Sequence, residues 1–348
     1  MEQFLINIIG EGILVDIIMS AIPLLFILPY ALVTIYLEMK IAAHIQDRVA
    51  YMVTGWHGVL QPFADILKLI QKEDIVPEAA NKILFNLAPF MVFVGTYATF
   101  AVLPFSSSYA GSELDLGILY VVAVSAIVVI GLLMAGWASN NKWSLFGALR
   151  SAAQIISYEI PTAFTILAIV MVAGTMNMQK ISEMQSGGIL NWFIFGGPFP
   201  MMQKLLFFPL MVILFFVQYI ASMAEVNRTP FDIPEAESEL VQGYNTEYSG
   251  MKFAFFYLAE YANLFAVSAI TVVMFFGGWS SPFGDLFSGP IWNSFWFITK
   301  GMFFVSVNIW LRWTLPRLRV DQLMYLSWKV LTPFAMFCVI AIGLILVL

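Results

Sequence analysis

The chain of 348 residues is 61% hydrophobic and only 11% charged, with a mean hydropathy of +0.86. A soluble domain is about half apolar and about a quarter charged, so this composition excludes a water-soluble protein and indicates an integral membrane protein. The net charge of −6 argues against nucleic-acid binding. Cys338, His44 and His57 are the chain's complete set of cysteines and histidines, too few for an iron–sulfur cluster or structural zinc. We therefore expect no metal site and no cofactor bound by this chain.

A stretch of about 20 apolar residues can cross a bilayer as a helix. Eight stretches meet this criterion, and in chain order they lie near residues 14–37, 83–103, 116–137, 160–178, 203–224, 253–277, 291–313 and 325–347. The first follows a segment without Lys or Arg and is too long for the apolar part of a signal peptide. The sequence therefore predicts an all-α integral membrane protein, a single domain over residues 1–348.

The basic residues are distributed unevenly between the loops. Thirteen of the 16 Lys and Arg residues lie in or beside one alternating set of loops, residues 38–82, 138–159, 225–252 and 314–324. The positive-inside rule places this set in the cytoplasm, and an even number of spans then places both termini on the outer, periplasmic side of the inner membrane. The same loops are rich in acidic and aromatic residues, so we expect the working surface and a large partner on this face.

The first cytoplasmic loop predicts an amphipathic helix in the membrane interface. Its apolar residues recur at helical spacing: Val59, Leu60, Phe63, Ile66, Leu67 and Ile70. Asp65, Lys68 and Lys72 lie on another face. This helix either anchors the surface, or it walls a cavity for an amphiphilic ligand together with Glu38 and Arg48, which lie near the end of the first span.

Glu159 stands in the second loop at the expected start of the fourth span, two residues before Pro161. An acid there is either stabilised by the helix dipole or has a functional role.

The third loop is the most acidic segment of the chain. Glu235 and Glu239 would share one face of a helix and repel each other. Crowding and partial burial raise the pKa of carboxyl groups, and groups with a pKa near neutrality can pass protons. The alternative is a solvated acidic loop, but apolar residues and prolines interleaved with the acids favour an ordered segment. The acids are Glu225, Asp232, Glu235, Glu237, Glu239 and Glu247.

Glu260 lies about seven residues inside the sixth predicted span, about 10 Å below the helix start. An ionisable residue at this depth costs a few kcal/mol unless it is protonated, paired or hydrated, and by default it marks a functional pathway. A structurally paired acid is the alternative. Tyr257 and Asn263, at i−3 and i+3, make this helix face polar.

The fourth loop carries Arg312, Arg317 and Arg319, which we interpret first as basic anchors at the membrane interface and only second as a docking site for a partner.

Four ordered segments resemble one family, the quinone-site membrane subunit of proton-pumping NADH:quinone oxidoreductase (respiratory complex I), which is equivalent to the first ND subunit of mitochondria. They read LQPFADILKLIQKED (60–74), GWASNNKW with LRSAAQIISYE (136–159), AEVNRTPFDIPEAESELVQGYNTEYSGMKFAFFYLAEYAN (224–263) and LRWTLPRLRVDQLM (311–324). The resemblance covers nearly the whole chain. It implies that electrons from NADH pass through FMN and iron–sulfur clusters on peripheral partner subunits to a quinone, the substrate. It also implies antiporter-like membrane partners that move protons.

The resemblance assigns roles to individual positions. The family usually has Arg where Met39 stands and a Gly-Pro turn where Ala50 and Tyr51 stand, which puts the local shape of the quinone entrance in question. The implied quinone chamber consists of Glu38, Arg48, Asp65, Lys68, Arg228 and Phe231. The implied carboxylate route, which couples quinone reduction to proton pumping, consists of Glu159, Glu225, Glu235, Glu237, Glu239 and Glu260.

Two other functions remain open from the sequence. One is the equivalent subunit of a membrane-bound hydrogenase-type complex, which has no quinone tail to house. The other is a free-standing ion transporter, for which we would expect internal repeats and acids on both faces.

Overall fold

The computed structural model describes residues 13–112, 114–284 and 286–347. These residues contain eight helices that are long and apolar enough to cross a membrane, which confirms the all-α fold class and the expected number of spans. A short antiparallel hairpin of β1 (Pro104–Ser106) and β2 (Tyr109–Ala110) lies between two of them.

The eight long helices follow the order of the predicted spans. They are α2 (Ile13–Ile45), α4 (Lys82–Phe100), α5 (Gly117–Ala138), α6 (Lys142–Ala173), α8 (Met201–Glu225), α10 (Gly250–Phe275), α11 (Pro290–Thr314), and α12 (Val320–Tyr325), which continues through the π-helical turn η5 (Leu326–Leu331) into α13 (Thr332–Val347). The shorter elements are η1 (Trp56–Gly58), α3 (Gln61–Gln71), α7 (Met178–Met184), η2 (Ile189–Asn191), η3 (Phe193–Phe195), α9 (Glu237–Leu240) and η4 (Gly243–Asn245).

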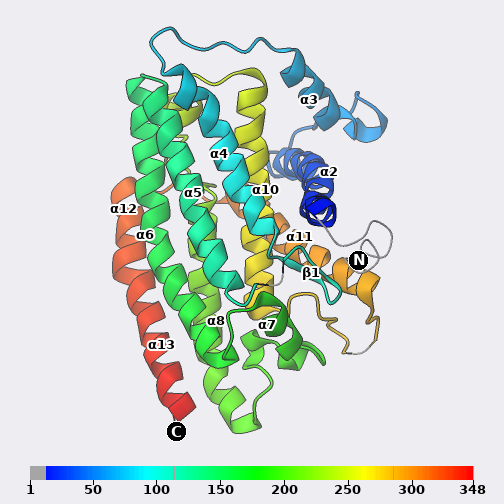
Figure 1. Cartoon of the computed structure of the whole chain (residues 1–348). Helices are drawn as coiled ribbons and strands as arrows, with labels where there is room; N and C mark the ends of the chain where they lie inside the picture. Colours follow the sequence, from blue (N-terminus) through cyan, green and yellow to red (C-terminus); the bar gives the residue numbers. More distant parts are fainter. Residues whose placement is uncertain (1–12, 113, 285, 348) are drawn as a thin grey trace.

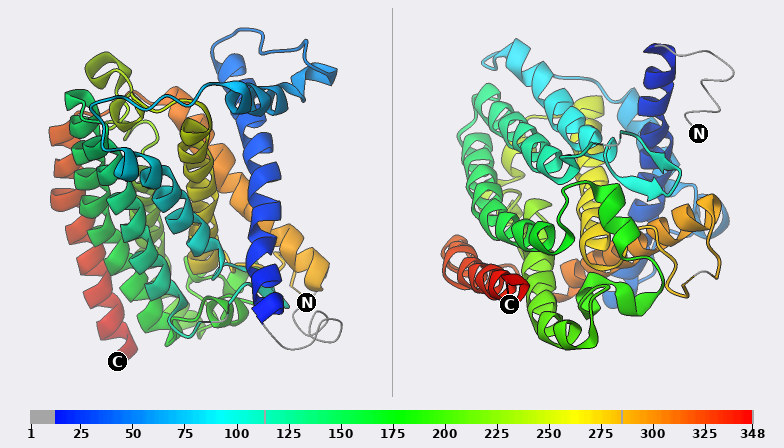
Figure 2. Two further views of the ribbon diagram at one scale, coloured as in Figure 1. Left: turned by 45° about the horizontal axis from the view of Figure 1, so that its top comes forward. Right: turned by 60° about the horizontal axis from the view of Figure 1, so that its bottom comes forward.

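The helix α10 forms the centre of the bundle (Figure 1). Its most apolar stretch is 83% buried, against 22% for the stretch formed by α12 and α13. It packs against α4, α11, α8 and α2, whereas α12–α13 and α2 stand at opposite sides of the molecule (Figure 2). A side chain on α10 can therefore meet groups from most of the other helices.

The helix α6 begins at Lys142, well before the span expected near 160–178. Asn141 caps it by accepting a hydrogen bond from the backbone N–H of Trp143 at 2.9 Å. Most of the expected loop 138–159 is therefore helical, because its small residues such as Gly147 and Ser151 pack inside the bundle without adding apolar length. Glu159 consequently lies in the middle of a helix, so a helix N-terminus does not account for it.

The predicted amphipathic helix forms as α3, at the same end of the molecule as the loop between α8 and α10 (Figures 1 and 2). Its neighbours are α2 and α10. The chain after α3 is tied to the start of α10 by an ion pair between Lys252 and Asp74 at 2.9 Å and by a hydrogen bond from the Ser249 hydroxyl to the Glu73 carbonyl at 3.1 Å. The first described turn of α2 and the end of α13 lie at the opposite end.

Candidate functional site

Glu38 is the centre of a buried charge cluster near the α3 end of the bundle. Its side chain is only 4% exposed, and Arg228 donates to both of its oxygens at 3.0 and 3.1 Å. Arg312 of α11 pairs with the same carboxylate, and the Tyr261 hydroxyl of α10 donates to it at 2.7 Å. Arg228 also pairs through its Nε with Glu260 of α10, at 2.7 Å. We call these five residues the Glu38 cluster; it balances two carboxylates with two guanidinium groups.

The loop after α8 carries Arg228, and Gln154 of α6 holds this loop in place. The Gln154 amide nitrogen donates to the carbonyls of Ala224 and Phe231, both at 2.8 Å, and to the side chain of Asn227 at 3.1 Å. Phe231 is buried, with its ring edge-on to that of Tyr158 at 5.5 Å. These contacts fix the loop against the bundle, so the guanidinium of Arg228 points inward rather than into the solvent.

Glu235 lies in the same loop and accepts hydrogen bonds from uncharged side chains. Asn245 donates to it at 2.8 Å, and the Tyr244 hydroxyl donates to it as well. Burial, followed by the charges of Glu260 and Asp232, raises the pKa of Glu235 to about 8. Glu235 therefore holds a proton at neutral pH and can release it under mild conditions.

A small cavity of about 30 Å³, lined by both apolar and polar residues, lies between Glu260 and Glu225, the last residue of α8. Tyr244, Asn227 and Asn263 also line it. A cavity of this size with several polar partners can hold an ordered water molecule. Such a water molecule would lie between the carboxyl groups of Glu260 and Glu225.

The carboxylates continue from Glu225 toward the α5–α6 face of the bundle. Glu225 is hydrogen-bonded to the side chain of Thr162 and lies in electrostatic range of Glu159. Glu159 in turn accepts a hydrogen bond from the Ser125 hydroxyl of α5 at 3.3 Å. The series Glu235, Glu260, Glu225 and Glu159 thus crosses the bundle from the loop beside α10 to the groove between α5 and α6.

An apolar pocket of about 140 Å³ lies between α2, α3 and α10, next to the Glu38 cluster. Tyr261 closes one side of this pocket while its hydroxyl donates to Glu38. The pocket is smaller than the roughly 300–1,000 Å³ typical of a complete small-molecule site, so it suits part of a lipid chain. Its lining comes from Leu28, Ala31, Leu32 and Ile35 of α2, Ile66 and Leu69 of α3, and Met251, Ala254, Phe255, Tyr257, Leu258 and Tyr261 of α10.

The segment between α2 and α3 folds back over the end of α2. Lys40 donates to the carbonyl of Tyr51 at 3.1 Å, and Tyr36 donates to that of His57 at 3.3 Å. Burial, followed by the charge of Asp65, raises the pKa of the Tyr51 phenol. Asp65 itself is exposed and accepts a hydrogen bond from Gln61 at 3.0 Å. This segment therefore forms a polar rim beside the apolar pocket.

Comparison with known proteins identifies the family. The NADH dehydrogenase family matches residues 18–343. The H subunit of NADH-quinone oxidoreductase from Chlorobaculum tepidum is 54% identical over 331 residues, which cover 92% of this chain and 89% of that protein. A second H-type subunit, from Cytophaga hutchinsonii, is 44% identical, over 92% of this chain and 96% of that protein.

The chain belongs to the family of NADH-quinone oxidoreductase H subunits. It is therefore a multi-pass membrane subunit of a multi-subunit NADH-quinone oxidoreductase. This identification replaces the hydrogenase-type and free-standing transporter alternatives.

Within this oxidoreductase subunit, the expected site residues other than Glu239 divide into three groups. Glu38, Arg228, Glu260, Glu235, Glu225 and Glu159 come together inside the bundle, with Phe231 packed beside them. Arg48, Asp65 and Lys68 are exposed near α3, and Arg48 donates to Gln46 at 2.6 Å. The backbone of Glu237 begins α9, but its side chain lies outside the described residues.

Glu239 is placed apart from the buried carboxylates. Its side chain is 47% exposed and pairs with Arg150 and Arg317, both at 2.6 Å. Hydrogen bonding and charge from these two arginines lower the pKa of Glu239. The i, i+4 relation expected for Glu235 and Glu239 does not form, because α9 begins at Glu237, so Glu235 lies before the helix and turns inward.

Two residues of the oxidoreductase site do not stand out in the sequence. Arg312 reads as an interface anchor, but its side chain reaches Glu38. A pattern in the sequence could have indicated this inward direction. Asn308 lies four residues before Arg312 on α11, so the two form a polar helix face, and Asn308 is buried. Tyr261 directly follows Glu260 in the sequence, and its hydroxyl donates to Glu38 on α2. No pattern in the sequence indicates this contact.

Proposed function

We propose that this chain forms the membrane side of the quinone chamber of NADH-quinone oxidoreductase and couples quinone reduction to proton movement through its buried carboxylates. The observation that carries the proposal is the double role of Tyr261. Its side chain walls the apolar pocket, and its hydroxyl binds the Glu38 cluster. A lipid tail in the pocket would therefore bring a reducible head group next to ionisable groups.

The apolar pocket supports a lipid-soluble substrate rather than a water-soluble one. The exposed faces of α2 and α3 beside it carry large apolar side chains such as Leu28 and Phe63. A quinone could enter here from the bilayer with its tail between α2, α3 and α10. Asp65, Lys68 and Arg48 lie on the rim, where they remain candidates for contacts with the head group as it passes.

Reduction of a quinone to a quinol takes up two electrons and two protons. The electrons would come from FMN and iron–sulfur clusters on peripheral subunits, which would dock on the cytoplasmic loops. On the side of this chain, Glu235 holds a proton at neutral pH, and Glu260, Glu225 and Glu159 continue away from the pocket. A change of charge near Glu38 would shift the proton occupancy of this series and reach the α5–α6 face, where an antiporter-like membrane subunit would respond.

The test replaces Glu260 by Gln in the assembled enzyme. Glu260→Gln keeps the side-chain shape but cannot ionise, so we expect NADH:quinone turnover and proton pumping to fall by about a hundredfold, the lower range for loss of a positioned proton-transfer group. NADH oxidation by ferricyanide, which needs no quinone chamber, should be unchanged.

The matched control is Glu247→Gln. Glu247 lies in the loop before α10 and accepts a hydrogen bond from the side chain of Asn141 at 2.6 Å, away from the buried series. We expect this variant to turn over normally. Full turnover and pumping in Glu260→Gln would remove Glu260 from the route.

A further inference from the structure

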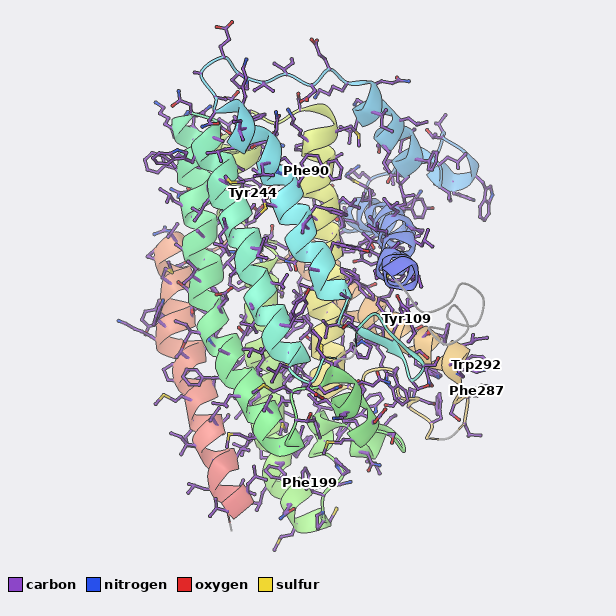
Figure 3. The ribbon with its side chains drawn as sticks, viewed as in Figure 1. Phe90, Tyr109, Phe199, Tyr244, Phe287 and Trp292 are labelled. Atoms are coloured by element: carbon purple, nitrogen blue, oxygen red, sulfur yellow. The ribbon has the colours of Figure 1, made fainter. Side chains whose placement is uncertain are left out.

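We propose that the hydroxyl of Tyr244 is a proton relay between Glu235 and the small cavity that Glu225 and Glu260 share. This inference rests on the carboxylate route proposed above and adds to it a residue that is not a carboxylate. Tyr244 lies in the turn η4 and is 5% exposed. Figure 3 places it in the upper part of the bundle, at the end near α3.

Tyr244 is the residue that contacts both sides of a gap in the series. On one side its hydroxyl donates to Glu235. On the other side it lines the cavity of about 30 Å³ with Glu225 and Glu260. Glu235 and Glu260 interact through their charges, and a proton needs a continuous chain of hydrogen bonds to pass between such groups. A phenol can complete that chain because its oxygen both donates and accepts.

The backbone around Tyr244 is built for a close approach to α6 and to the loop. Gly243 has a φ of +56°, and a Cβ on it would lie 1.9 Å from the carbonyl oxygen of Pro234. A Cβ on Gly147 of α6 would lie 2.8 Å from the backbone nitrogen of Tyr244. Only glycine fits at either position. The ring of Tyr244 packs edge-on against Phe256 of α10 at 5.6 Å, so its direction is fixed.

The relay step conserves charge on the tyrosine. For the relay the Tyr244 O–H first turns from Glu235 toward a water molecule in the cavity. The proton of protonated Glu235 then moves to the phenolic oxygen as the phenolic O–H bond breaks and its proton moves to that water, which leaves the hydroxyl donating to the Glu235 carboxylate. Glu235 becomes a carboxylate, Tyr244 stays neutral, and the proton continues to Glu260 or Glu225. Burial and the charge of Glu235 raise the pKa of Tyr244 above its usual value, so a tyrosinate does not accumulate as a trap.

The alternative is that Tyr244 has a structural role alone, as its neighbour Tyr248 has. Tyr248 is also buried, stacks on Phe85 with ring centroids 4.1 Å apart, and donates to the Phe85 carbonyl at 3.2 Å. It does not line the cavity. Tyr248 is therefore a matched control for Tyr244. The same Tyr→Phe substitution can be made in the same segment, once at the proposed relay and once away from it.

The test compares Tyr244→Phe with Tyr248→Phe in the complete enzyme reconstituted in liposomes. Both variants keep their rings. We expect Tyr244→Phe to lower quinone turnover and pumping per assembled complex by about a hundredfold, the lower end of the range for loss of a positioned proton-transfer group, and to raise the solvent deuterium isotope effect on turnover. Ferricyanide reduction should be unchanged, and Tyr248→Phe should behave like the native enzyme in every measurement.

Several results would overturn the relay. Native turnover and isotope effect in Tyr244→Phe, combined with a loss in Glu260→Gln, would reject the relay and leave the carboxylate route standing. Equal losses per assembled complex in Tyr244→Phe and Tyr248→Phe, without a change in isotope effect, would show that both rings only support packing. Native behaviour of both Tyr244→Phe and Glu260→Gln would reject the route itself.

Discussion

Two carboxylates in the site differ in how their charge is balanced. Glu38 has Arg228 and Arg312 as partners, and removing one partner of a buried pair of this kind costs about 3–5 kcal/mol. Glu235 accepts hydrogen bonds from Asn245 and Tyr244 instead, and its pKa is raised to about 8. Glu38 is thus paired with guanidinium groups, whereas Glu235 is hydrogen-bonded to uncharged side chains.

The raised pKa of Glu235 predicts a pH dependence of turnover. Because its pKa is raised, Glu235 keeps its proton through neutral pH and loses it as the pH rises through about 8. Deprotonated Glu235 can no longer donate a proton, so quinone turnover should fall above about pH 8. In Glu235→Gln this alkaline limb should disappear and leave a low, flat rate, measured as kcat between about pH 6.5 and 9.5.

Glu239→Gln provides the comparison for this profile. Glu239 is exposed, paired with two arginines and has a lowered pKa, so its replacement should leave the alkaline limb in place. Loss of the limb in Glu239→Gln and its persistence in Glu235→Gln would reverse the assignment of the two residues.

At the scale of elements, the apolar pocket depends on the way α3 is held against α2 and α10. The ends of α3 are fixed by the folded segment before it and by the Lys252–Asp74 pair after it. Ile66 and Leu69 turn toward the pocket, while Phe63, Leu67 and Ile70 remain exposed. An amphipathic helix with apolar residues on both of these sides can lie in the bilayer interface and cover a pocket at once.

Filling this pocket should discriminate between quinones. Ala254 of α10 lines it, so Ala254→Trp places an indole where we expect the lipid tail. We expect the KM for a long-tailed quinone to rise by about tenfold, roughly 1.4 kcal/mol of lost binding, with a smaller change for a short-tailed analogue. Steady-state kinetics with the two substrates measures this.

The control for this variant is Leu25→Trp, on α2. Leu25 is 75% exposed and does not line the pocket. If Ala254→Trp raised the KM for both quinones equally, the substitution would have damaged the site in general. The pocket would then not be the binding site of the quinone tail.

At the scale of the whole molecule, the chemistry is concentrated at one end. The helix α3 and the acidic loop, which carries Arg228, lie at the end opposite to the start of α2 and the end of α13 (Figure 2). Basic residues gather in the same loops, which we expect in the cytoplasm. A peripheral electron donor would then dock on the face where the quinone is reduced.

Cysteine labelling tests this orientation. Cys338 is buried and is the chain's one native cysteine, so single exposed cysteines can be added at Glu78 and Leu190, which lie at opposite ends. In right-side-out vesicles an impermeant maleimide should label Leu190→Cys and spare Glu78→Cys. In inside-out vesicles stripped of peripheral proteins it should label Glu78→Cys. The reverse pattern would place the acidic loop on the outer face.

The number and order of the membrane helices followed from the sequence, because a backbone in lipid has to satisfy its own hydrogen bonds and each apolar run of sufficient length becomes a helix. The same reasoning found Glu260, whose burial in a span is a local property. The sequence did not predict where α6 begins. The first half of this helix packs in the bundle through small residues and contains no long apolar run.

The partners of each charge were decided only by the tertiary structure. Glu38 pairs with Arg228 and Arg312, which lie 190 and 274 positions away in the chain. Glu235 and Glu239 are four positions apart, yet the first is half-buried in electrostatic range of Glu260 and the second is exposed between two arginines. Residue type and spacing fix which groups can ionise, whereas the packing of α2, α10 and α11 fixes the charge and solvent around each group, and these set its pKa.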